Sequence, residues 1–97
     1  MKTKMVRFIT REKMDEMLAK GELVVKRRLP GETEALVVPA GRLTECGLLT
    51  GYMADDILGK ELRIVHSKAY GCWRTGLWSI PDWLIQISEE LPDGTDN

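Results

Sequence analysis

The chain is 97 residues long, with 43% hydrophobic residues, 30% charged residues and a formal net charge of −1. This length accommodates one domain with a single core, and the composition is that of an ordinary soluble globular protein. A net charge this close to zero argues against attraction of the whole molecule to nucleic acid or anionic lipid.

The first elements in the chain are a predicted strand and a predicted helix. Residues 5–9 form a short extended run, and Thr10 is a suitable N-cap for a helix over residues 11–20. Gly21 follows as a C-terminal stop. The helix carries a narrow apolar stripe at helical spacing, which is typical of packing against a core: Met14, Met17 and Leu18.

The middle of the chain predicts a hairpin and a short helix. Residues 22–29 and 35–38 are extended runs separated by the charged loop Gly31 to Glu34. Residues 41–51 predict a bent connection or a short strand, because their glycines flank a pair of leucines. One or two turns of helix are expected over residues 52–58.

The remaining chain, residues 59–87, is dominated by strand patterns and carries all three tryptophans. Leu62 and Ile64 alternate with charged residues, which is the period of a half-buried strand. Glycine-containing turns then separate a second and a third strand, and one helical turn at Pro81 leads into a last strand. Strands this short favour a small barrel or half-barrel.

Several of these segments together resemble a group of small phage and prophage proteins. The similarity lies in Gly47-Leu48-Leu49, the short helix through Leu58, Gly59-Lys60 entering a strand, and Trp78-Ser79 before Asp82-Trp83-Leu84. That group is built on an SH3-like barrel of the kind also seen in mind-bomb-type repeats. Residues 76–84 also resemble the end of an SH3 domain, where a proline and an aromatic residue bracket one 3₁₀ turn between the last two strands.

The resemblance covers residues 35–87 and implies an α+β fold, a small antiparallel SH3-like β-barrel with one N-terminal helix packed on it. We expect residues 1–88 to form a single domain, with a strand–helix–strand extension ahead of the barrel. Residues 89–97 are acidic and contain a proline and a glycine, which predicts a flexible tail.

An aromatic set is the first candidate binding site. Its members could form a groove for a polyproline-type peptide or an interface hot spot on a protein partner: Tyr70, Trp73, Trp78 and Trp83. Core packing is the competing interpretation for each tryptophan. We expect Trp83, which lies beside Pro81 and after a polar residue, to be the exposed one.

A basic set in the first half is the second candidate site. It could contact phosphates and give salt-sensitive binding of nucleic acid, and it consists of Arg7, Arg11, Lys26, Arg27 and Arg28. The same residues could instead protect the edge of a strand from pairing with another chain. The overall negative charge favours this second interpretation.

Residues with catalytic or metal-binding chemistry are few. Cys46, Cys72 and His66 lack the paired spacing of a zinc site. A thiol–histidine pair from Cys72 and His66 would have no evident oxyanion donor or orienting carboxylate. There is no glycine-rich phosphate loop. We therefore expect no metal site, no cofactor and no enzymatic activity.

These observations favour a non-enzymatic binding protein, specifically a phage or mobile-element accessory protein that binds a host protein and modulates or inhibits it. A nucleic-acid-binding barrel is the first alternative, and a self-associating structural component such as a homodimer is the second. No apolar run approaches the roughly 18 residues of a membrane span, and the first residues lack the apolar core of a secretory signal. We therefore expect a cytoplasmic protein with no membrane partner.

Overall fold

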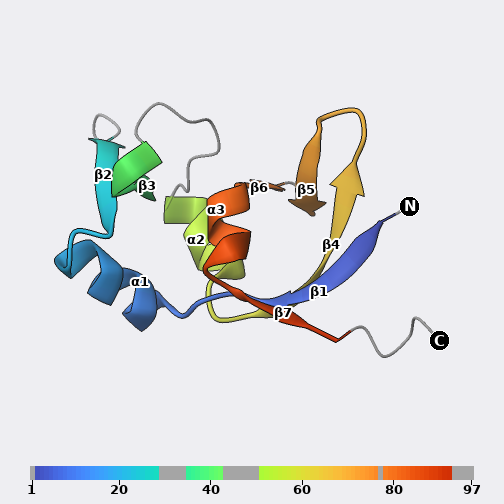
Figure 1. Ribbon diagram of the computed structural model, residues 1–97, viewed down its shortest axis with the longest axis horizontal. Coiled ribbons are helices and arrows are strands. Elements are labelled where there is room, and N and C mark those ends of the chain that lie inside the picture. Colours follow the sequence, from blue (N-terminus) through green and yellow to red (C-terminus); the bar gives the residue numbers. More distant parts are fainter. Residues whose placement is uncertain (1, 29–34, 43–50, 77, 93–97) are drawn as a thin grey trace.

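The computed structural model describes residues 2–28, 35–42, 51–76 and 78–92. Their elements, shown in Figure 1, are β1 (Thr3–Arg7), α1 (Arg11–Ala19), β2 (Leu23–Arg28), β3 (Ala35–Pro39), the 3₁₀ helix η1 (Ala40–Arg42), α2 (Gly51–Ile57), β4 (Glu61–Ser67), β5 (Cys72–Thr75), β6 (Trp78–Ile80), α3 (Asp82–Gln86) and β7 (Glu89–Leu91).

The strands form two antiparallel sheets. Five of them pair in the order β6-β5-β4-β1-β7, and β2 and β3 form a separate hairpin. The predicted antiparallel α+β fold is therefore confirmed. The described strands form an open sheet whose edges are β6 and β7, so a closed barrel is not shown.

Strand β1 lies inside the larger sheet rather than in an extension ahead of it. Thr3 stands opposite Val65 of β4, and Met5 stands opposite Leu91 of β7. The segment between β1 and β4 is closed at its base by two backbone hydrogen bonds. The Phe8 amide donates to the Lys60 carbonyl at 2.9 Å, and the Gly59 amide donates to the Ile9 carbonyl at 2.8 Å.

Local signals determine where the helices begin and end. The Thr10 side chain accepts a hydrogen bond from the Lys13 amide at 3.1 Å, as an N-cap does. Gly21 follows α1 and Gly59 follows α2, with φ values of 79° and 77° that other residues adopt only with strain. The predicted helices at residues 11–20 and 52–58 are both confirmed, within one residue at each end.

One core joins the two sheets. Figure 1 shows α2 and α3 between the β2–β3 hairpin and the five-stranded sheet. A single cluster of buried residues draws on the helices, the hairpin and the larger sheet: Val6, Phe8, Met14, Leu23, Val37, Met53, Ala54, Ile57, Ile64, Ile80, Trp83 and Leu84.

The prediction of a flexible tail over residues 89–97 is wrong at its start. Glu89–Leu91 form β7, and the prediction is wrong for these three residues. The reason is that these residues pair with the free edge of β1, where Met5 stands opposite Leu91, and exposed ion pairs from Arg7 to Glu89 at 2.8 Å and from Lys4 to Glu90 at 3.6 Å accompany this pairing. Residues 93–97 lie outside the described residues, as do the predicted loop at 31–34 and most of the segment at 41–51.

Candidate functional site

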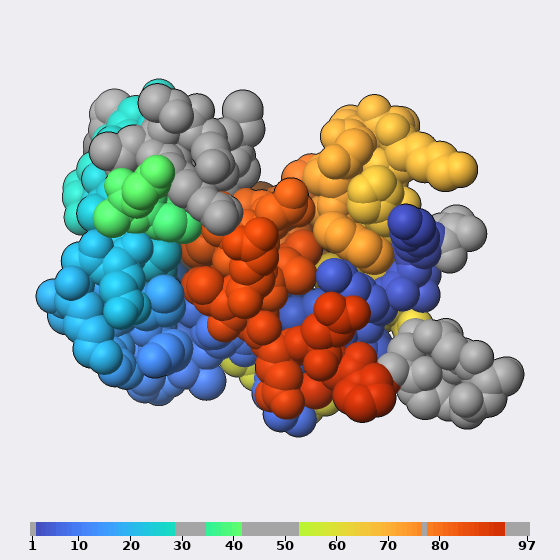
Figure 2. All heavy atoms as spheres, viewed as in Figure 1, coloured from blue at the N-terminus to red at the C-terminus, as the bar shows by residue number. Residues whose placement is uncertain are grey.

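The β4–β5 hairpin positions most of the candidate side chains. In Figure 2 the yellow-to-orange atoms of this hairpin stand out from the body of the molecule. Its register places His66 opposite Trp73 and Val65 opposite Arg74. Residues that are opposite in an antiparallel pair share a face, and neighbours along a strand alternate. Trp73 therefore belongs to the inner face with Ile64, while Arg74 belongs to the outer face.

Trp73 sits at the rim of the core beside two polar side chains. Its ring lies 5.2 Å from the His66 ring, centre to centre, at an angle of 83°. The Lys4 ammonium is 4.6 Å from the centre of the Trp73 ring, within the range of a cation–π contact. Trp73 is half-buried and packs against the core cluster, so only part of its surface can meet a ligand.

Tyr70 lies in the turn between β4 and β5 and is 70% exposed. The guanidinium carbon of Arg74 is 4.4 Å from the centre of the Tyr70 ring, and Arg74 also donates to the Ser79 hydroxyl at 3.0 Å. The Tyr70 amide donates to the Ser67 hydroxyl at 3.2 Å. The turn and the arginine therefore hold an exposed aromatic ring in a defined position.

Trp78 and Trp83 have surroundings different from those of Trp73. Trp78 is half-buried, and its indole nitrogen donates to Asp56 in α2 at 2.6 Å. Trp83 is only 2% exposed, so the prediction that it is the exposed tryptophan is wrong. The helical turn after Pro81 is the cause, because it directs Trp83 and Leu84 into the core while Asp82 and Gln86 remain exposed.

The predicted basic set is not assembled into one face. Arg7 lies between Glu61 and Glu89, at 3.4 Å and 2.8 Å, and these carboxylates raise the pKa of Arg7. Arg11 pairs with Asp55. The remaining three members, Lys26, Arg27 and Arg28, are exposed on the separate β2–β3 hairpin.

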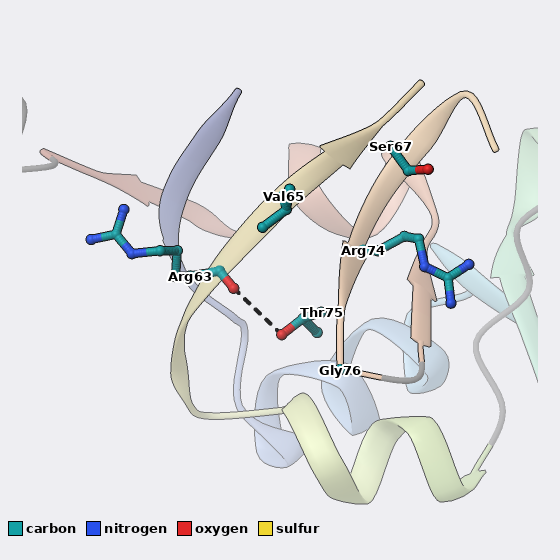
Figure 3. Close-up of a pocket in the computed structure, with 6 residues that line it drawn as sticks. All are labelled: Arg63, Val65, Ser67, Arg74, Thr75 and Gly76. Atoms are coloured by element: carbon teal, nitrogen blue, oxygen red, sulfur yellow. Dashed lines mark hydrogen bonds between the residues drawn. The ribbon is translucent and has the colours of Figure 1, made fainter. Parts of the chain in front are cut away.

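An open pocket of about 300 Å³ lies on the outer face of the larger sheet, and the sequence patterns did not reveal it. Figure 3 shows Val65 at its centre, with the Arg63 and Arg74 side chains extending to opposite sides. The hydroxyls of Ser67 and Thr75 and the backbone of Gly76 complete the lining. The Thr75 hydroxyl donates to the Arg63 carbonyl at 3.4 Å, and Arg63 donates to the Thr3 hydroxyl at 3.4 Å.

Among the described residues, those with catalytic or metal-binding chemistry are not brought together. His66 and Cys72 occupy opposite faces of the hairpin, since His66 is opposite Trp73 and Cys72 is opposite Ser67. Across the described ranges, no group of three or more His, Cys, Asp or Glu side chains could hold a metal ion. Cys46 lies outside those ranges. None of the described helices is long and apolar enough to cross a membrane.

No protein-family model matches the chain, and searches of curated proteins and of solved structures returned no match either. Functional inference for this protein therefore depends on the surface chemistry described above.

Proposed function

We propose that the protein is a non-catalytic binding protein that engages a partner protein through the exposed ring of Tyr70 at the tip of the β4–β5 hairpin, with the partly exposed Trp73 and Trp78 on the opposite face of the sheet as further candidate contacts. The observation that carries this proposal is the exposed ring of Tyr70, held in place by Arg74 at the tip of the hairpin. Tyr, Trp and Arg are the residue types enriched where protein interfaces concentrate their binding energy.

Pre-organisation supports the proposal. Among the described residues, Tyr70 and Val25 are the large hydrophobic side chains that are exposed. Tyr70 differs from Val25 because a cation stacks on its ring and its own amide is hydrogen-bonded within the turn. A side chain that is already ordered loses less conformational entropy on binding, so more of its contact energy appears as affinity.

The resemblance of residues 35–87 to small phage and prophage proteins with an SH3-like barrel supports a more specific form of the proposal. One short helix, α3, follows Pro81 and separates β6 from β7, at the place where the resemblance implies a 3₁₀ turn, and it is α-helical. On this proposal the protein is an accessory protein of a phage or mobile element. Its partner is a host protein in the host cytoplasm, which it modulates or inhibits.

Nucleic-acid binding through the basic set has less support. Arg7 and Arg11, two of its five members, are already paired with carboxylates. Breaking such pairs to contact phosphates would offset part of the energy gained.

Retention of bacterial lysate proteins on the immobilised protein tests the proposal. We expect a partner that is retained by the wild type and by Val25→Ala, the matched control with the other exposed hydrophobic residue. Retention should fall by about tenfold or more in Tyr70→Ala, the loss expected for an interface hot spot. A partner retained equally by Tyr70→Ala, or no retained protein at all, would contradict the proposal.

A further inference from the structure

We propose that the outer-face pocket binds an extended peptide segment carrying two carboxylates, one placed at Arg63 and the other at Arg74. The inference rests on the proposed function, because the segment would belong to the partner protein. It adds the chemistry that the partner presents, at the outer face where Arg74 also stacks on the Tyr70 ring.

The lining of the pocket is suited to acidic groups. Two guanidinium groups and two hydroxyls surround Val65, and no acidic residue contributes to the lining among the described residues. A guanidinium presents a planar set of N–H donors that matches a carboxylate. The apolar patch at Val65 offers a contact for a small hydrophobic side chain between the two charges.

The two arginines bracket the pocket instead of converging on one point. Arg63 extends from β4 toward β1, where it donates to Thr3, and Arg74 extends from β5 toward β6, where it donates to Ser79 (Figure 3). The guanidinium groups are therefore separated by roughly the three strand spacings from β1 to β6, about 14 Å in total. A single carboxylate is too small to bridge this distance.

An extended peptide matches this separation when its acidic residues are four positions apart. Four residues of extended chain span about 13 Å. Residues i, i+2 and i+4 of such a chain point to the same side. The recognised pattern is thus acidic–x–apolar–x–acidic, crossing the strands with its central apolar residue on Val65.

A longer polyanion fits this face less well than a short acidic segment. Arg7, Glu61 and Glu89 occupy the same outer face near its far end, since Arg7 stands opposite Glu61 and also opposite Glu89. These two carboxylates would repel the phosphates of a nucleic-acid strand that ran along this face parallel to the β-strands. A short peptide that crosses the strands at Val65 avoids that repulsion.

The test is a fluorescence-anisotropy titration of the full chain with the labelled peptide Gly-Glu-Thr-Val-Thr-Glu-Gly. A peptide with glutamine in place of both glutamates is the control ligand. Exposed charge pairs contribute about 0.2–1 kcal/mol each. We therefore expect Arg74→Gln to weaken binding about threefold and the double variant Arg63→Gln/Arg74→Gln to weaken it by up to about tenfold. Arg27→Gln, which removes the same charge from the separate hairpin, should leave affinity unchanged.

Equal affinity for the glutamine peptide, no binding of either peptide, or equal weakening by Arg27→Gln would overturn the inference. Tighter binding of a single-stranded oligothymidine that is lost in Arg74→Gln would overturn it in favour of nucleic acid. The two proposals fail separately. Tyr70-dependent retention of a partner without peptide binding leaves only the binding role of Tyr70 standing, and peptide binding without a retained partner leaves only the pocket.

Discussion

Trp73 and Trp83 have the same side chain in opposite surroundings. Trp83 is enclosed by the core cluster, whereas Trp73 packs against that cluster with one side and meets Lys4 and His66 with the other. The difference comes from the element that carries each residue. Trp83 lies in a short helix over the core, and Trp73 lies in a strand close to the tip of the hairpin.

Truncating these residues should separate their contributions to stability. Trp83→Ala removes a fully buried aromatic ring, and we expect the free energy of unfolding to fall by about 3–5 kcal/mol. Trp73→Ala should cost clearly less because its ring is partly exposed, and Tyr70→Ala should change stability by no more than about 0.5 kcal/mol. Urea unfolding of the three variants measures these values. A cost for Tyr70→Ala equal to that of Trp83→Ala would contradict the assignment.

At the residue scale, the aromatic set could be predicted from the sequence, but which of its side chains are buried and which are exposed could not. Period-two alternation predicts which residues share a face of one strand, and it cannot give the register between strands. Arg63 and Arg74 become the two sides of a pocket because Val65 stands opposite Arg74. That pairing depends on the length and geometry of the turn at residues 68–71, so the pocket could not be predicted.

At the scale of the element, prediction succeeded where the signal is local. Thr10 caps α1, Gly59 ends α2, and the β2–β3 hairpin forms between the two predicted runs. Prediction failed where partners are distant in sequence. The position of β1 between β4 and β7 depends on contacts across most of the chain, and pairing with β1 makes residues 89–91 a strand, β7, at the start of the predicted tail.

Helix α1 should lose part of its stability in acid. A hydrogen bond from Lys20, together with the charges of Lys13 and Lys20, lowers the pKa of Glu16. A carboxyl group whose pKa falls on folding stabilises the folded state above its unfolded pKa, and this contribution disappears as the pH falls through the folded value. The pairs are exposed, so the effect is small and screened by salt.

The corresponding variant is Glu16→Gln. We expect its urea midpoint to lie below that of the wild type at about pH 7, and the two midpoints to converge as the pH falls below the lowered pKa of folded Glu16, where the carboxyl is protonated in both states. Asp15→Asn removes the same charge from the same helix, at a position that forms no ion pair among the described residues, and serves as the control. A Glu16→Gln difference that persists in acid would show a cause other than charge.

At the scale of the whole molecule, the two sheets are expected to unfold together because they share one core. Leu23 of β2 and Val37 of β3 belong to the same buried cluster as Ile64 and Ile80 of the larger sheet. Small domains with a single core usually unfold in one cooperative step. The hairpin is therefore an integral part of the domain.

Leu23→Ala tests this coupling. The substitution should lower the free energy of unfolding by about 2–5 kcal/mol, and native-state hydrogen exchange should show faster exchange at the amides of β4 as well as those of β2. Val25→Ala, at an exposed position of the same strand, should leave both strands nearly unchanged. Faster exchange confined to β2 and β3 would show instead that the hairpin opens on its own.

The two backbone hydrogen bonds that close the segment between β1 and β4 have a consequence for the order in which the strands form. Arg7 and its neighbour Glu61 are 54 residues apart in sequence, whereas a four-residue turn separates β4 from β5. Closing the longer loop costs about 2 kcal/mol more chain entropy, so the β4–β5–β6 meander can form before β1 is recruited. On a ribosome, β1 would therefore wait without a neighbouring strand until β4 had emerged.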